Sequence, residues 1–324
     1  MDYYLSTSPK LSGLQQKDYE RFLHQCGLRD ENDTDFTALI ISDEEEILAC
    51  GSLRGNVLKQ IAVSPSAEGL GLCAEIVTAL VSEAAARGDT HLFLYTKPAH
   101  RAMFAGLGFT PLVQTSDILM MENRPNGIAS YLSSLPQLSG RVGAIVCNCN
   151  PFTLGHRYLI EYASQHCDEL YVFVLSEERS FFPADIRFQL VKEGTAHLPN
   201  VHVVPSSSYL ISRATFPTYF IKDTARCADA ACELDITLFG QVIAPRLGIT
   251  VRFVGQEPFD PVTRGYNELM KKQLPAMGIE LVEIERFENI SASRVRHCLQ
   301  EKKLDELQSL LPEVTYEYCR SHFS

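Results

Sequence analysis

After residue 142, short apolar runs alternate with helical segments, and this alternation constrains the fold more than any other feature of the sequence. Strands are expected at residues 142–147, 169–175, 201–204, 249–254 and 279–284. Helices are expected near residues 155–164, at residues 184–196 and from residue 292 onward. Alternating strands and helices favour a mostly parallel sheet with helices on both faces. The C-terminal half is therefore predicted to be an α/β domain.

The first 120 residues follow a different pattern, in which strands that are neighbours in the sequence are expected to pair with each other. Two apolar runs, residues 36–42 and 47–53, flank the acidic turn DEEE and predict an antiparallel hairpin. A helical pattern at residues 17–27 precedes them, and a third strand at residues 57–63 leads into a glycine-bearing loop. A helix, a strand and a second helix then follow at residues 73–87, 91–95 and 99–107. This order predicts an α+β domain.

The two patterns meet in residues 122–141, ENRPNGIASYLSSLPQLSGR, which are rich in Pro, Gly and Ser. This composition is typical of a linker, with room for one short helix at residues 128–135. A length of 324 residues also suggests two domains, at roughly 150 residues each. We place the boundary at residue 137 and expect domains at 1–137 and 138–324.

Composition argues against several classes of function. Lys and Arg total 29 and Asp and Glu total 40, so the net charge of −11 argues against sequence-independent binding of nucleic acid. No apolar run approaches the roughly 18 residues that cross a bilayer, and the start MDYYLSTSPK lacks the blocks of a secretory signal. None of the 10 cysteines forms a C-x-x-C pair, so no zinc site is indicated. We expect a cytoplasmic protein without a nucleic-acid or membrane partner and without a metal site of its own.

A glycine loop follows the third N-terminal strand, in the order Val63-Ser-Pro-Ser-Ala-Glu-Gly69-Leu-Gly71. Free amides at the start of the next helix suit a pyrophosphate, and Gly69 and Gly71 let the backbone approach it closely. The loop resembles the acetyl-CoA loop of the GNAT (Gcn5-related N-acetyltransferase) fold, V-x-P-x-x-R-G-x-G. Residues 97–109, KPAHRAMFAGLGF, resemble its N-x-x-A-x-x-L-Y-x-x-x-G-F segment.

Two departures from this pattern bear on function. Glu68 stands where the GNAT family usually has a basic residue, and Phe104 stands where many members have the tyrosine that protonates the leaving thiolate. A phenyl ring has no proton to donate. The resemblance therefore implies a domain that holds a pantetheine-like arm or a partner rather than one that transfers acetyl groups, and a purely structural domain is the alternative.

A second loop follows the strand at residues 143–147 and reads Asn148-Cys-Asn-Pro-Phe-Thr-Leu-Gly-His156. In open α/β sheets, ligands bind where a parallel strand ends and a helix begins. The loop resembles the (H/T)-x-G-H signature of the nucleotidyltransferase superfamily, with Thr153 and His156 at its ends. Hydrogen-bond donors of this kind stabilise charge on an α-phosphate. We assign Thr153 and His156 to that role, and we assign the nucleotide-binding loop to Asn150, Pro151, Phe152 and Gly155; a simple helix cap is the alternative.

A matching segment near the C-terminus reads Ile290-Ser291-Ala-Ser293-Arg294-Val-Arg296. It resembles the I-S-S-T-x-x-R signature that partners the first motif in the same superfamily. Ser291 and Ser293 can cap a helix and hydrogen-bond a phosphate tail, and Arg296 can clamp the β- and γ-phosphates. Two half-motifs about 140 residues apart, each opening a helix, are a specific signal. They predict a Rossmann-like nucleotidyltransferase domain.

The string CNCNPFTLGHRYLI at residues 147–160, together with the GNAT-like domain upstream, resembles the citrate lyase ligase family over essentially the whole chain. The resemblance implies an acid–thiol ligase that forms acetyl-adenylate from acetate and ATP and releases diphosphate. It then implies transfer of acetyl to the thiol of the dephospho-CoA-derived prosthetic group on the acyl carrier subunit of citrate lyase, which activates that enzyme. The GNAT-like domain would then present this arm.

Two further stretches, residues 214–222 and 254–267, match the same family. They imply Lys222 as a second cation on the phosphates, with a surface lysine as the alternative. They also imply a nucleotide or acyl pocket lined by Glu257, Thr263, Tyr266 and Asn267. Arg187 is either a phosphate contact or part of a solvated helix face. Mg²⁺ is expected to be carried by ATP, since no cage of carboxylates is visible.

Three other functions stay open on the sequence alone. The nucleotidyltransferase signature also serves adenylyltransferases that act on a phosphopantetheine- or mononucleotide-type substrate. An acetate-dependent tRNA-modifying ligase is a neighbour, against which the net charge of −11 counts. A nucleotide-binding scaffold without turnover is the alternative that is not an enzyme.

Overall fold

The computed structural model describes residues 2–176, 180–210, 217–221, 226–258, 260–288 and 290–323. The chain divides into two compact units. The first contains Met1–Gly127 and Pro217–Leu234, and the second contains Ile128–Phe216 and Asp235–Ser324. The first unit thus ends ahead of residue 137 and includes a segment from the second half of the chain. A domain limit at residue 137 stays a prediction.

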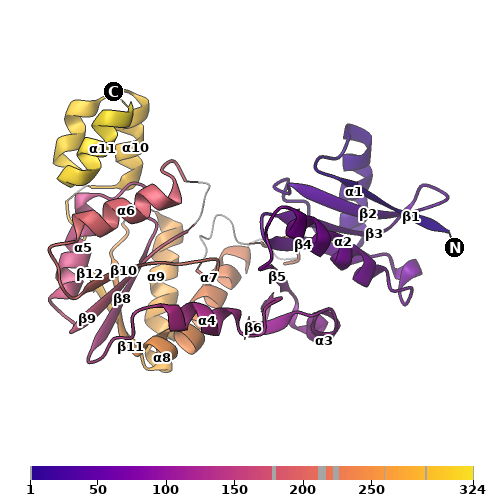
Figure 1. Ribbon diagram of the computed structural model, residues 1–324, viewed down its shortest axis with the longest axis horizontal. Coiled ribbons are helices and arrows are strands. Elements are labelled where there is room, and N and C mark those ends of the chain that lie inside the picture. Colours follow the sequence, from indigo (N-terminus) through magenta and orange to yellow (C-terminus); the bar gives the residue numbers. More distant parts are fainter. Residues whose placement is uncertain are drawn as a thin grey trace. The chain divides into compact units, whose positions relative to one another are not determined.

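The first unit is built on a seven-stranded sheet (Figure 1). The hairpin of β2 (Phe36–Ser42) and β3 (Ile47–Arg54) is antiparallel, as the acidic turn between them predicts. The full strand order is β1 (Tyr3–Ser8), β2, β3, β4 (Val57–Val63), β5 (Phe93–Thr96), β7 (Leu119–Glu122) and β6 (Thr110–Gln114). The expected α+β organisation is confirmed.

Helices α1 (Gly13–Gln25) and α2 (Leu72–Ala86) cover opposite faces of this sheet. Successive side chains of a strand point to opposite faces, so β2, whose residues are all buried, contributes side chains to both helices. Leu39 and Ile41 pack with α1 in one core, whereas Ala38 and Ile40 pack with α2 in another. The short helix α3 (Arg101–Gly106) follows β5.

Strands β4 and β5 are parallel, and they pair at their first residues alone. Val57 lies opposite Phe93 and Leu58 opposite Leu94, after which no register is kept between the two strands. The later residues of β4 and β5 line a cavity of about 810 Å³. The divergence of this parallel pair therefore opens this cavity in the first unit.

The second unit contains a five-stranded sheet in the order β10 (Val201–Pro205), β9 (Glu169–Val174), β8 (Val142–Cys147), β11 (Ile249–Gly255) and β12 (Glu280–Ile284). Every recorded pairing is parallel, which confirms the prediction. The chain runs from β8 outward through β9 and β10, and later from β11 to β12. The strand order therefore reverses between β8 and β11, and ligands bind at the carboxyl ends of strands at such a point.

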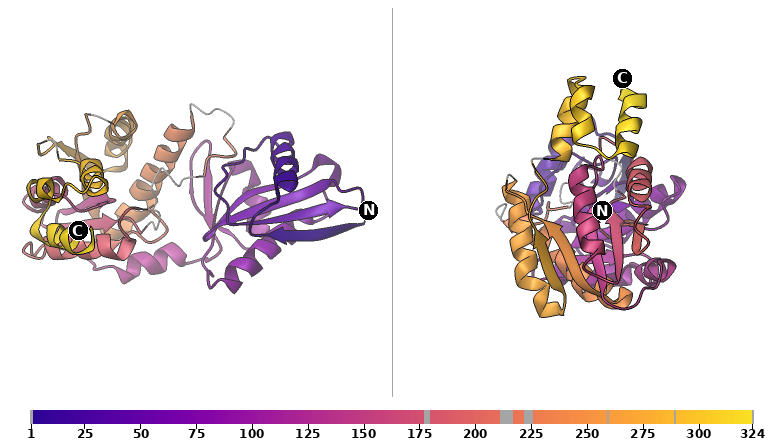
Figure 2. Two further views of the ribbon diagram at one scale, coloured as in Figure 1. Left: turned by 90° about the horizontal axis from the view of Figure 1, so that it is seen from above. Right: turned by 90° about the vertical axis from the view of Figure 1, so that its left-hand side faces the viewer.

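Helices α5 (Leu154–Ser164) and α6 (Ala184–Gly194) lie on one face of this sheet and α9 (Pro261–Gln273) on the other (Figure 2). The remaining helices are α4 (Gly127–Ser134), α7 (Cys227–Leu238), α8 (Ala244–Leu247), α10 (Ala292–Gln300) and α11 (Glu313–Phe323), with a π-helical segment at Phe239–Ile243. Among the residues with described positions, no helix combines the length and the apolar character that a membrane span requires.

The packing of α2 on β3 makes a testable prediction at Gly51. A Cβ atom at this position would lie 2.5 Å from Cγ2 of Ile76 and 2.9 Å from Cδ1 of Leu80. We expect Gly51→Ala to destabilise the first unit by about 1–3 kcal/mol, because overpacking forces the helix away from the sheet. Gly13→Ala is the control, since nothing lies within 4 Å of its Cβ position. Calorimetry of both variants checks this; equal melting temperatures would contradict the packing.

Candidate functional site

A cavity of about 400 Å³ lies at the carboxyl ends of β8 and β11 in the second unit. Both nucleotidyltransferase-like motifs contribute to its wall, although they are far apart in the sequence. From the two motifs come Thr153, Gly155, His156, Ser291 and Ser293, and from the stretch at residues 254–267 come Glu257, Thr263, Tyr266 and Asn267. The structure therefore brings together most of the residues that the sequence assigns to a nucleotide or acyl pocket.

Thr153 caps the start of α5 and orients His156. Its hydroxyl accepts a hydrogen bond from the backbone N–H of His156 at 3.4 Å, and its own backbone N–H donates to Nδ1 of His156 at 3.1 Å. A backbone N–H can only donate, so Nδ1 is an acceptor and the proton of the neutral ring lies on Nε2. His156 is therefore positioned as a neutral N–H donor.

The charge state of His156 agrees with this hydrogen bonding. Burial, with a smaller contribution from the nearby guanidinium of Arg286, lowers the pKa of His156 to about 4. The ring is therefore neutral near pH 7. The geometry therefore favours a neutral hydrogen-bond donor over a positive charge at His156.

The second motif forms the start of α10. Ser291 caps this helix by accepting a hydrogen bond from the backbone N–H of Arg294 at 3.1 Å. Arg296 donates from Nη2 to Oγ of Ser293 at 3.0 Å and from Nη1 to the carbonyl oxygen of Asn150 at 2.5 Å. Arg296 thus ties the second motif to the loop of the first. It is not among the residues that line the cavity.

Two arginines in the cavity wall were not anticipated from the sequence. Arg286 forms an ion pair with Glu257 at 2.8 Å and also donates to the carbonyl oxygen of Ile290 at 3.2 Å. Arg252 lies 4.4 Å from the ring centroid of Phe239 and donates to the hydroxyl of Tyr266 at 3.2 Å. Arg252 interrupts the apolar run of β11, and this interruption could have marked it in the sequence as a candidate site residue. No comparable sequence signal marks Arg286.

Residues 150–152 of the loop before α5 do not line the cavity and instead anchor the loop to the protein core. Phe152 is fully buried in the hydrophobic core, and the side-chain oxygen of Asn150 accepts a hydrogen bond from the backbone N–H of Phe182 at 2.9 Å. The Asn150–Pro151 peptide bond is cis. Nucleotide contacts by Asn150, Pro151 and Phe152 stay predictions.

Arg187 holds the same loop and is not on a solvated helix face. Its side chain is fully buried, so that interpretation is wrong. The guanidinium donates to the carbonyl oxygens of Asn148 at 2.8 Å, Leu175 at 2.8 Å and Phe182 at 3.0 Å. Arg187 therefore joins the ends of two strands to α6, because a buried guanidinium must satisfy its donors within the protein.

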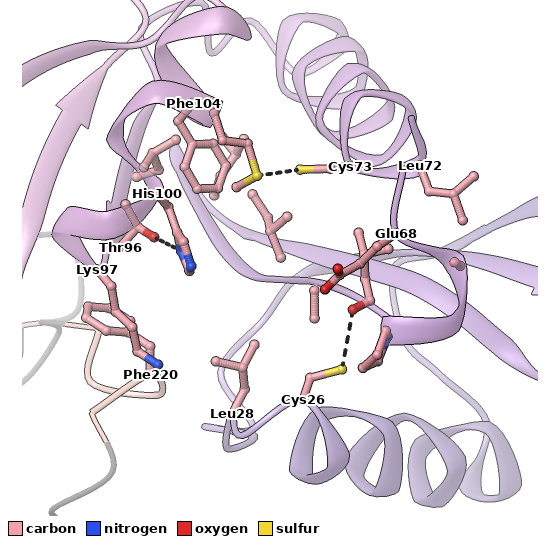
Figure 3. A pocket seen from close by; sticks show the side chains of 18 of the residues that line it. Cys26, Leu28, Glu68, Leu72, Cys73, Thr96, Lys97, His100, Phe104 and Phe220 are labelled. Carbon is pink, nitrogen blue, oxygen red and sulfur yellow. Dashed lines mark hydrogen bonds between the residues drawn. The ribbon is translucent and has the colours of Figure 1, made fainter. Parts of the chain in front are cut away.

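The glycines of the first predicted loop lie in the first unit, at the cavity between β4 and β5 (Figure 3). Gly69 and Gly71 have φ of +84° and +80°, and Gly71 precedes the first residue of α2. Residues with a side chain rarely adopt this backbone conformation, so the loop needs glycine at both positions. Glu68 lines the same cavity and directs a carboxylate into it.

The segment Pro217–Ile221 completes the wall of this cavity with Tyr219 and Phe220. Glu31 accepts hydrogen bonds from the backbone N–H and the hydroxyl of Thr218, at 2.8 and 3.1 Å. The hydroxyl of Tyr219 donates to the carbonyl oxygen of Tyr95 at 3.3 Å. Sequence reasoning did not foresee this return of the chain to the first unit. Lys222, the predicted second cation, lies outside the described residues.

Comparison with known proteins agrees with both halves of this description. A family profile described as the citrate lyase ligase C-terminal domain matches residues 142–319, and the acetyltransferase (GNAT) family profile matches residues 3–109. The chain is 42% identical over 311 residues to a citrate (pro-3S)-lyase ligase of Klebsiella pneumoniae, covering 92% of this chain and 91% of the relative. An Escherichia coli K12 relative of the same name is 41% identical over 314 residues, covering 93% and 89%.

A third relative matches a smaller share of the chain. It is a phosphopantetheine adenylyltransferase of Streptococcus gordonii, 34% identical over 115 residues, which covers 34% of this chain and 70% of the relative. The expected GNAT-like domain and nucleotidyltransferase-like domain are confirmed by these matches together with the two sheets.

The environment of His156 predicts its titration. With Nδ1 held by a backbone N–H and the pKa lowered to about 4 by burial, the ring should stay neutral and protonated at Nε2 down to about pH 5. Nitrogen-15 NMR of histidine-labelled protein, with His156→Gln to assign the signal, measures this. A midpoint near 6.5, the value of a free imidazole, would contradict the described hydrogen bonding.

Proposed function

Because this chain belongs to the citrate lyase ligase family, we propose that it activates acetate with ATP and passes the acetyl group to the prosthetic-group thiol of the citrate lyase acyl carrier subunit. The observation that carries this proposal is the convergence of the two motifs, Thr153–His156 and Ser291–Ser293, on one cavity. ATP as co-substrate fits the cytoplasmic location that the sequence leads us to expect.

In the first step, an acetate oxygen bonds to the α-phosphorus of ATP, and the bond from that phosphorus to the oxygen bridging the β-phosphate breaks. Diphosphate leaves with the electron pair, and acetyl-adenylate remains. Negative charge is concentrated on the α-phosphate oxygens in the transition state. His156 stabilises it through Nε2–H, a fixed donor that needs no reorganisation. Thr153 contributes by holding the His156 ring, because its backbone N–H and its hydroxyl lie 3.1 and 2.9 Å from Nδ1.

The leaving diphosphate is held by the start of α10. Ser291, Ser293 and the adjacent backbone amides provide hydrogen-bond donors, and Arg296 and Lys222 provide positive charge. Within the described part of the chain, no group of three or more His, Cys, Asp or Glu side chains could hold a metal ion. Since Glu257 is paired with Arg286, phosphate oxygens are the ligands that suit Mg²⁺, which enters with ATP.

In the second step, the sulfur of the prosthetic group bonds to the acetyl carbon, the carbon–oxygen bond to the adenylate breaks, and AMP leaves. The first unit supplies a place for the arm that carries this thiol. Its cavity of about 810 Å³ has the loop of Gly69 and Gly71 at one end, where backbone amides suit a phosphate group, and a largely apolar wall beyond.

The proposal is tested by incubating the full chain with ATP, acetate and deacetylated citrate lyase while diphosphate and lyase activity are measured. Recovery of lyase activity that requires both ATP and acetate supports the ligase. Turnover with a phosphopantetheine or mononucleotide in place of acetate would indicate an adenylyltransferase, and acetate-dependent modification of tRNA would indicate the RNA-directed ligase. ATP binding without any turnover would indicate a scaffold.

Removal of the His156 imidazole should slow the first step. We expect His156→Ala to lower acetate-dependent diphosphate release by about 10²-fold or more, the scale of losing one transition-state donor. His166→Ala is the matched control, because His166 is exposed just beyond α5 and bonds only locally, to the carbonyl oxygen of Tyr162. A near-normal rate in folded His156→Ala protein would remove this residue from the mechanism.

A charge placed in the glycine loop should affect the second step alone. We expect Gly71→Asp to leave diphosphate release intact and to slow acetyl transfer to the carrier by at least about tenfold, because a second carboxylate, added to that of Glu68, would repel the arm's phosphate. Gly88→Asp controls for backbone strain, since Gly88 has φ of +91° at the other end of α2 and does not line the cavity. Equal losses in both steps, or in both variants, would argue against arm binding.

A further inference from the structure

His100 lies on the wall of the first-unit cavity, immediately before α3, with its ring directed into the cavity beside Phe104 (Figure 3). In the pattern N-x-x-A-x-x-L-Y that this segment resembles, His100 stands at the alanine position and Phe104 at the tyrosine position. The cavity therefore lacks the phenol of the pattern and contains an imidazole four residues earlier. Both side chains line the same cavity, so the imidazole faces the space in which the phenol of the pattern would lie.

The hydrogen bond of His100 is compatible with gaining a proton. Oγ1 of Thr96 lies 3.1 Å from Nδ1 of His100. A hydroxyl can accept as well as donate, so it accepts from Nδ1–H both when the ring is neutral and when Nε2 is protonated. In that tautomer, the lone pair of Nε2 is available to a ligand. His156 differs, because a backbone N–H occupies its Nδ1.

The electrostatic surroundings keep His100 ready to accept a proton. Burial, followed by the charge of Lys97, lowers the pKa of His100 from its usual value. Burial raises the pKa of the thiols of Cys26 and Cys73, so these remain protonated and do not compete as bases. The titratable and charged groups that share the cavity wall with His100 are Cys26, Glu68, Cys73, Tyr95, Lys97 and Tyr219.

We propose that His100 is the proton acceptor for the thiol of an arm bound in this cavity, an inference that rests on the proposed function. The S–H bond breaks as an N–H bond forms at Nε2. The thiolate then bonds to the carbonyl carbon of acetyl-adenylate, the carbon–oxygen bond to the adenylate breaks, and AMP leaves with that electron pair. The imidazolium finally returns its proton to water.

The test separates the two steps in the full chain. Acetyl-adenylate is formed first from ATP and labelled acetate, and its formation is followed by diphosphate release. The deacetylated carrier subunit is then added, and acetyl transfer is measured between pH 6 and pH 10. The proteins compared are the wild type, His100→Gln and His100→Ala, with His24→Gln as the control because His24 is exposed on α1 and does not line the cavity.

We expect His100→Gln to release diphosphate normally and to transfer acetyl about 10²-fold more slowly at pH 7. The deficit should shrink toward pH 10, because the thiol then ionises without a base, and added imidazole should partly restore transfer by His100→Ala. A transfer rate within twofold of wild type would overturn the role of His100. A deficit that is the same at every pH and is not rescued by imidazole would also overturn it. Absence of acetate-dependent diphosphate release from the wild type would instead refute the proposed function.

Discussion

The hydrogen bond from Arg296 to the carbonyl oxygen of Asn150 joins two segments that lie 146 residues apart. Parallel pairing of β8 with β11 brings strand ends to one edge of the sheet, but it does not fix the helices that follow. Arg296 links the start of α10 to the loop before α5, and Arg187 holds that loop to the strand ends beneath it. The starts of α5 and α10 then face one cavity, as binding of a single triphosphate by both motifs would require.

The two histidines that line the cavities show how one neighbouring atom decides what an imidazole can do. At His156 a backbone N–H as well as a hydroxyl faces Nδ1, and because the N–H can only donate, the ring is held as a neutral donor. At His100 the partner is a hydroxyl, which tolerates either protonation state. Under the proposed function these are opposite tasks, donation to a phosphate by His156 and acceptance from a thiol by His100, and the difference in hydrogen bonding suits each ring to its task.

The sequence predicted those strands and helix starts that depend on residues close together in the chain. Strands β2, β4 and β8 were predicted with their observed bounds, because each is a mainly apolar run between turn residues. Strand β1 was missed, since it is largely exposed and carries no apolar pattern. The helix starts at Thr153 and Ser291 follow from their own residues, and so both motifs could be placed. Partners of Arg286 and Arg187 depend on contacts between distant segments, which spacing alone does not reveal.

The wall formed by Tyr219 and Phe220 ties the first unit to sequence that lies within the matched citrate lyase ligase C-terminal domain. A fragment ending at residue 137 would lack this wall, and Glu31 would lose both hydrogen bonds from Thr218. The N-terminal unit is thus not a detachable module added in front of an adenylating enzyme. A graft of residues 1–137 between relatives would therefore transfer a cavity with one side open, because Tyr219 and Phe220 come from the later segment.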